Sequence, residues 1–150
     1  MHAATTHPEY PFPGDRHYDR ETHLWALPEP DGPCVLVGID VLGLAALGDL
    51  AYVSLCEPGT AVRRGEPVGT LEAAKMTGEI LAPLGGVVRR CNLAAARDPS
   101  RVNADPYGCW LVAIEPADWS REAAELVSGP ALAGWVAGEL ARYRAEGWIA

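Results

Sequence analysis

The sequence has 150 residues, enough for one domain with a substantial hydrophobic core but too few for a second catalytic domain. Its formal net charge of −8 argues against binding to nucleic acid or to an anionic membrane surface, because both require clustered cations. No apolar run approaches the roughly 20 residues that span a bilayer, and the first residues lack the hydrophobic region of a signal peptide, so we expect a cytoplasmic protein.

The cysteines and histidines form no recognisable metal or redox motif. The cysteines stand at positions 34, 56, 91 and 109, without a Cys-x-x-Cys pair, and we expect free, mostly buried thiols. All four histidines lie within the first 23 residues, so no metal ligand set is predicted. Catalytic residues are not predicted either, because the sequence has no Ser/His/Asp set and no paired carboxylates at a recognisable spacing.

Residues 1–15 are rich in proline and poor in aliphatic side chains. Such a composition is typical of an extended or mobile segment outside the hydrophobic core. We therefore interpret these residues as a flexible lead-in, with regular structure beginning near Tyr18.

Residues 16–117 are predicted to form a β domain, because short apolar runs alternate there with turn-forming residues. The runs are Cys34–Ile39, Ala51–Leu55, Val68–Leu71, Glu79–Ala82, Gly86–Val88 and Trp110–Ile114. Many short strands at close spacing are typical of a β-barrel or sandwich. The apolar segment Val41–Leu50 differs in its periodicity and predicts one short helix that ends at Gly48-Asp49.

Residues 118–150 are predicted to form a helical extension that packs on the β domain. Asp118 and Ser120 are candidate N-caps of a first helix, and Ser128 is a candidate N-cap of a second. Apolar side chains then recur at helical spacing, at Leu132, Trp135, Val136, Leu140 and Tyr143. We interpret this stripe as packing on the domain's own core, with a partner-docking helix as the alternative.

Lys75 is the only lysine, whereas arginine supplies the other eleven cations. Arginine keeps its proton and cannot form an ordinary amide, so a lone lysine suits chemistry that needs a primary amine. The segments 67–71 and 79–83 predict a hairpin with the lysine exposed at its tip. A modifying enzyme can reach an amine placed there, and an attached arm can swing between partners. Chance survival of one lysine on a solvated turn is the alternative.

The residues around Lys75 form part of an ordered set of motifs. The hairpin carries Glu72-Ala73-Ala74-Lys75, followed by Ala82-Pro83 and Gly86. Residues 17–118 also contain His23-Leu24-Trp25, Val37-Gly38-Ile39, Leu47-Gly48-Asp49, Gly65-Glu66-Pro67 and the loop from Asn103 to Gly108. The hairpin resembles that of biotinyl/lipoyl carrier domains, and the whole set resembles the glycine cleavage H-protein family.

The resemblance implies a mainly β fold, a flattened barrel-sandwich hybrid with short helices that include a C-terminal helical segment. It implies a carrier protein rather than an enzyme, with lipoate joined to Lys75 as an amide and with Glu72 recognised by the lipoate ligase or lipoyl transferase. The lipoamide arm would shuttle between pyridoxal-phosphate, folate-dependent and flavin enzymes of glycine cleavage. A tethered arm makes each transfer nearly intramolecular.

Some residues depart from the H-protein pattern and leave alternatives open. Ala73-Ala74 replaces the usual Ser-x before the lysine, and Met76 resembles the biotin-carrier signature, so biotin competes with lipoate as the attached group. The C-terminal segment from Ala117 to Ala150 is longer than in many H proteins. The lead-in from Phe12-Pro13-Gly14-Asp15 to Tyr18-Asp19 resembles that of H-like lipoate-binding proteins, some of which serve heterodisulfide-reductase-like proteins in sulfur oxidation. An unmodified scaffold protein on the same fold is a further alternative.

Overall fold

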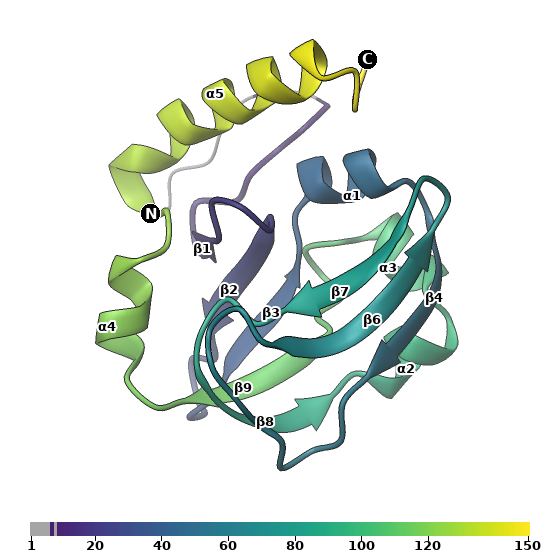
Figure 1. Ribbon diagram of the computed structural model, residues 1–150. Coiled ribbons are helices and arrows are strands. Elements are labelled where there is room, and N and C mark those ends of the chain that lie inside the picture. Colours follow the sequence, from purple (N-terminus) through teal and green to yellow (C-terminus); the bar gives the residue numbers. More distant parts are fainter. Residues whose placement is uncertain (1–6, 8) are drawn as a thin grey trace.

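The computed structural model describes residue 7 and residues 9–150, and their strands form two antiparallel sheets (Figure 1). One sheet has the order β1-β2-β3-β9-β8-β5, with β1 at His17–Tyr18, β2 at Leu24–Pro28, β3 at Val35–Ile39, β9 at Val112–Pro116, β8 at Gly86–Cys91 and β5 at Ala61–Val62. The other has the order β4-β6-β7, with β4 at Leu50–Leu55, β6 at Pro67–Ala73 and β7 at Thr77–Leu81. Two sheets that do not close into one barrel confirm the predicted mainly β sandwich.

Aliphatic side chains from both sheets fill the space between them, because each strand directs alternate residues inward. This sandwich core contains Val37, Ile39, Val53, Leu71, Ile80, Val88 and Ile114 among its buried members. Each of the six predicted apolar runs coincides with a strand of the structure or overlaps it. Short apolar runs between turn-forming residues were therefore sufficient to locate these strands.

The predicted short helix is α1, at Val41–Leu47. Its N-cap is Asp40, whose carboxylate accepts hydrogen bonds from the backbone N–H groups of Leu42 and Gly43. It ends at Leu47 with Gly48 as its C-cap, as predicted, because Gly48 takes a φ of 80° and Leu50 already begins β4. Two further short helices, α2 at Leu93–Arg97 and α3 at Ser100–Ala104, were not predicted from the sequence.

After β9 the chain forms α4 at Trp119–Ala124, the 3-10 helix η1 at Gly129–Ala131 and α5 at Leu132–Ala145. Asp118 caps α4 through its side chain as predicted, whereas Ser128 precedes η1 without a side-chain capping bond. Figure 1 shows α5 lying across the N-terminal part of the chain and the C-terminal end returning towards α1.

The apolar stripe of α5 packs on the protein itself, as the sequence predicted. It joins an aromatic cluster whose members include Phe12, Tyr18, Trp25, Leu132, Trp135, Val136, Leu140 and Tyr143. In the same region the Trp25 indole N–H donates to the carbonyl of Pro106 at 3.1 Å. Two of the motifs noted in the sequence, His23-Leu24-Trp25 and the Asn103–Gly108 loop, are thereby in direct contact.

Two sequence-based expectations need correction. In the predicted flexible lead-in, residues 1–6 and 8 lie outside the described residues, but Phe12 is fully buried and packs on Tyr18 and Trp135. The prediction counted aliphatic residues and missed that one aromatic ring can anchor a proline-rich segment. The thiols were expected to be mostly buried, yet only Cys34 is, and the other three cysteines are partly exposed.

Candidate functional site

Lys75 lies at the tip of the hairpin formed by β6 and β7, as predicted. The strands pair from Pro67 with Leu81 to Glu72 with Thr77, and the backbone N–H of Ala73 closes the turn by donating to the carbonyl of Met76 at 2.9 Å. Residues 74–77 are all exposed, so the lysine is accessible from solvent.

The hairpin tip is fixed to the segment between α1 and β4. The backbone N–H of Lys75 donates to the carbonyl of Leu47 at 2.9 Å, and that of Ala74 donates to the carbonyl of Asp49 at 3.0 Å. Gly48 lies between these acceptors, and a Cβ there would stand 3.0 Å from the Cβ of Ala74, in addition to the strain of a positive φ. Glycine therefore allows the tip to approach this closely.

Asn103 secures the same segment from the other side. Its side-chain oxygen accepts from the backbone N–H of Leu50 at 2.9 Å, and its amide nitrogen donates to the carbonyl of Leu50 at 3.1 Å. The start of β4 is thus fixed to α3, and the hairpin tip is fixed to the residues just before β4. This chain of contacts gives Lys75 a rigid base.

The ammonium group of Lys75 contacts two backbone carbonyls that the sequence did not suggest. Nζ donates to the carbonyl of Ala45, in the last turn of α1, at 2.9 Å, and to the carbonyl of Trp148 at 3.4 Å. A cation near the C-terminal end of a helix is favourable because carbonyl groups are unpaired there. These partners lie 30 and 73 positions away from Lys75 in the sequence, so no local motif predicts the two contacts.

A groove of about 530 Å³ lies beside the hairpin tip. Its walls come mainly from the loop before β2, from α1, from the hairpin tip and β7, and from α5 and the residues after it. The lining residues include Glu21, Ala46, Leu47, Met76, Ile80, Tyr143 and Trp148. A largely apolar groove of this size is suited to a small organic group.

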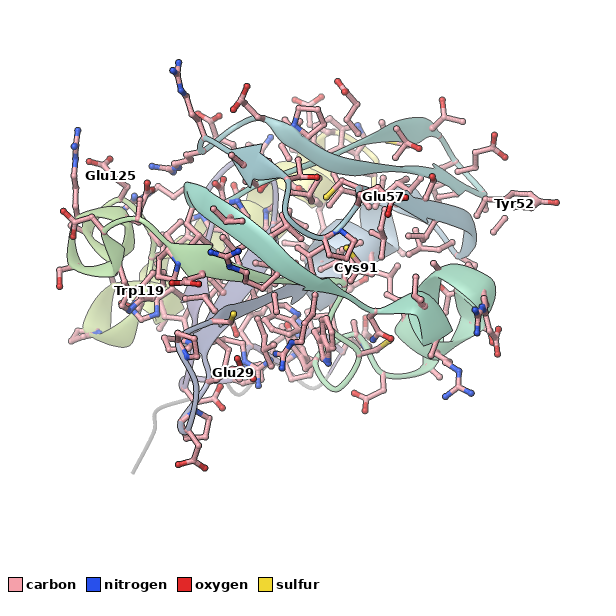
Figure 2. All side chains as sticks on the ribbon, turned by 90° about the horizontal axis from the view of Figure 1, so that it is seen from below. Glu29, Tyr52, Glu57, Cys91, Trp119 and Glu125 are labelled. Carbon is pink, nitrogen blue, oxygen red and sulfur yellow. The ribbon has the colours of Figure 1, made fainter. Side chains whose placement is uncertain are left out.

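Glu72, the predicted ligase-recognition residue, is exposed on β6. It pairs with Tyr52 on β4 and with Thr77 on β7, so all three side chains share the outer face of the sheet. Figure 2 shows Tyr52 projecting from the edge of the molecule, and 69% of its surface is exposed.

Sequence reasoning missed a buried ionic network behind the site. His23 Nδ1 lies 2.7 Å from Asp40 Oδ2, and its Nε2 lies 2.8 Å from Glu139 Oε1. Arg142 pairs with the same Glu139 at 2.9 Å. One detectable signal was Glu139 itself, a carboxylate placed on the apolar stripe of α5 between Val136 and Leu140.

The network favours a charged imidazolium at His23. Burial disfavours that charge, but hydrogen bonds and charges from Asp40 and Glu139 outweigh burial and raise the pKa of His23. Arg142 and His23 hold the pKa of Glu139 below its usual range, against the effect of burial. Burial raises the pKa of Asp40, against the hydrogen bond and charge of His23 and the backbone N–H groups at the start of α1. When Asp40 and Glu139 are both carboxylates, both ring nitrogens must be donors, which only the imidazolium provides. The network therefore ties the loop before β2 to α5.

The cysteines are poorly suited to thiolate chemistry. Burial raises the pKa of Cys91 to about 11, with a contribution from Cys56, and burial also raises the pKa of Cys34 and Cys109. The Cys91 thiol donates to the backbone carbonyl of Cys56 at 3.0 Å. These three groups stay protonated near neutral pH, and the thiol form is a weak nucleophile.

The described part of the chain contains no group of three or more His, Cys, Asp or Glu side chains placed to hold a metal ion. Within the same residues, no helix has the length and apolar character that crossing a bilayer requires.

Comparison with known proteins gives one consistent family. A family model described as "Glycine cleavage H-protein" matches residues 16–137. The chain is 46% identical over 108 residues to the glycine cleavage system H protein of Thermus thermophilus, covering 71% of this chain and 82% of the relative. It is 42% identical over 108 residues to that of Myxococcus xanthus, covering 71% and 81%.

A solved structure agrees with these sequence matches. The crystal structure of a glycine cleavage system H protein from Mycobacterium marinum superposes with a TM-score of 0.72 at 37% identity, covering 84% of this chain and 99% of that one.

Proposed function

The chain belongs to the glycine cleavage H-protein family, and from this premise we propose that it carries lipoate as an amide on Lys75 and serves the glycine cleavage system. A member of this family is a carrier component and has no catalytic activity of its own. One observation supports Lys75 above all: the only lysine of the sequence is exposed at a fixed hairpin tip beside an apolar groove.

The residues around the site fit the proposed group. Lys75 supplies the amine, and the groove walls, such as Leu47, Ile80 and Trp148, supply apolar contacts for an acyl chain. When bound, lipoate supplies a dithiolane on a long arm that can undergo thiol–disulfide chemistry. The protein's own task is to anchor the arm, to orient it and to present it to partners.

The partners follow from the same proposal. A lipoate ligase or lipoyl transferase would recognise the hairpin with Glu72, and pyridoxal-phosphate, folate-dependent and flavin enzymes would use the arm in turn. Residues 16–117 would act as the carrier domain and residues 118–150 as an extension supporting it. A cytoplasmic location remains part of the proposal, and fractionation of native cells tests it.

Intact mass and fragmentation of protein from its native host test the attachment. We expect one lipoyl increment on Lys75, whereas a biotinyl increment would replace lipoate by biotin in this proposal. The Lys75→Arg variant should lose the increment completely and keep its melting temperature, because arginine retains the charge but cannot accept an acyl group. Unmodified Lys75 in native protein would contradict the proposal and favour the scaffold alternative.

A reconstitution tests the pathway separately. Lipoylated protein is mixed with a glycine decarboxylase of the same system, and we expect it to accept the aminomethyl group derived from glycine. Failure to do so by a protein that is nevertheless lipoylated would direct attention to the heterodisulfide-reductase-like alternative. The relatives named above are all glycine cleavage H proteins, which favours the first outcome.

A further inference from the structure

The C-terminal segment, residues 146–150, returns over Lys75. The carbonyl of Trp148 accepts from Lys75 Nζ at 3.4 Å, and the backbone N–H of Trp148 donates to the carbonyl of Tyr143 at 2.9 Å. The two rings meet edge to face at 5.0 Å. Since the family match ends at residue 137, Tyr143 and Trp148 lie outside the matched region.

Trp148 belongs both to the lysine's surroundings and to the groove. Trp148 and Tyr143 line the groove together with residues of α1 and β7, and 43% of the Trp148 surface is still exposed. An indole that is only half covered has apolar surface left to bury when a further apolar group enters the groove.

The position of Trp148 is fixed from α5. The guanidinium of Arg142 lies 5.0 Å from the ring centre of Tyr143 and 5.5 Å from that of Trp148. Arg142 is itself paired with Glu139, which contacts His23 in the buried network. The wall is therefore connected to the protein interior and is preorganised before any ligand enters.

We propose that Trp148 is a positioning residue for the acyl arm on Lys75: its indole is the outer wall against which the arm packs. This inference rests on the proposed function, since the occupant is the group attached to Lys75 of the same molecule. Nζ of Lys75 lies 3.4 Å from the backbone carbonyl oxygen of Trp148, and both Trp148 and Met76, the next residue after Lys75, line the groove, so an attached chain begins close to the groove.

Acylation also changes the backbone contacts of the amine. The ammonium has three N–H donors, whereas the amide formed by loss of protons and of the acyl leaving group has one N–H and no charge. A single donor can keep the shorter bond to Ala45, and the carbonyl of Trp148 is released. The indole then gains contact with the arm as the backbone contact is lost.

The test uses full-length protein acylated with an active ester of lipoic acid, which needs no ligase. Because Lys75 is the only lysine, the species modified there is selected by mass and fragmentation. The measured quantity is the rate at which a water-soluble phosphine reduces the dithiolane, since an arm resting in the groove is shielded. We expect Trp148→Ala to raise this rate about fivefold, from the apolar contact removed.

Two variants separate positioning from a general structural effect. Trp148→Phe should react nearly as slowly as the unmutated protein, because it restores an aromatic wall. Tyr52→Ala removes an even more exposed aromatic that does not line the groove and should leave the rate unchanged. In addition, the emission of Trp148, obtained by subtracting the spectrum of Trp148→Phe, should fall on acylation, because a nearby disulfide quenches an indole.

An unchanged reduction rate in Trp148→Ala would overturn the positioning role and leave lipoate attachment intact. Conversely, native protein without lipoate would overturn the proposed function, while the chemically acylated protein still decides the role of Trp148.

Discussion

The sandwich core and the aromatic cluster of this protein are built in different ways. The sandwich core lies between two sheets and consists of aliphatic side chains that alternate along local strands. The aromatic cluster joins segments from the two ends of the chain, such as Phe12 and Tyr143, and surrounds the ionised His23 network. Stability in the first therefore depends on volume and shape, whereas in the second it also depends on charge.

Of the changes that test this contrast, removing the His23 ring should lower the free energy of unfolding the most. His23→Asn leaves Asp40 and Glu139 facing each other across a buried space, at a cost of about 3–5 kcal/mol in unfolding free energy. Asparagine is chosen because residue 23 has a φ of 61°, which asparagine tolerates. Denaturant titration measures the change.

A matched control is His17→Asn. His17 packs on Trp119 at 5.0 Å, and its Nδ1 has no hydrogen-bond partner among the described residues. Its replacement removes a ring but leaves no buried carboxylate unpaired, so a smaller loss is expected. Equal losses in both variants would show that ring packing, and not charge, dominates at His23.

The next largest effect should be the change of the unfolding free energy with pH, which is at most about 1.4 kcal/mol per pH unit when one proton is bound or released. The pKa of His23 is raised in the folded protein, so its contribution is complete below the unfolded pKa of about 6.5 and is lost as pH rises through the folded pKa. The stability difference between unmutated protein and His23→Asn should therefore shrink from pH 6 to pH 9.

His17 should show the opposite slope. Burial lowers the pKa of His17, so its neutral form is favoured on folding and stability is lost as pH falls below about 6.5. The difference between unmutated protein and His17→Asn should grow as pH rises. Parallel slopes for both variants would contradict the assignment of a charged His23 and a neutral His17.

A small change in the sandwich core should have the smallest effect. Ile114→Val removes one methylene from a fully buried position in β9, at a cost of about 1 kcal/mol. No titrating group takes part in that contact, so the loss should be the same from pH 6 to pH 9. If the loss of stability varied with pH, the sandwich core would be coupled to the titrating groups of the aromatic cluster.

The same contrast explains what could be predicted from the sequence. Six of the nine strands in the described residues, the β6–β7 hairpin and the exposure of Lys75 follow from local apolar runs and turn residues, and they were predicted, whereas β1, β2 and β5 were not. His23 contacts Asp40 and Glu139 across 17 and 116 positions, and Lys75 contacts Trp148 across 73, so these pairs depend on the packed chain. Asp40 as a helix cap and Glu139 on an apolar stripe were the available signals of a buried ionic network. Neither position indicates that His23 is the residue it contacts.

Because its single lysine lies at the hairpin tip, the protein can be cross-linked selectively to molecules that approach this tip. Apart from the amino terminus, amine-directed cross-linkers have one side-chain target, and it stands at the exposed tip of the β6–β7 hairpin. In unacylated protein, any neighbour captured through a lysine-specific reagent must have approached that tip. The chain can thus report its own encounters in a cell extract without an engineered label.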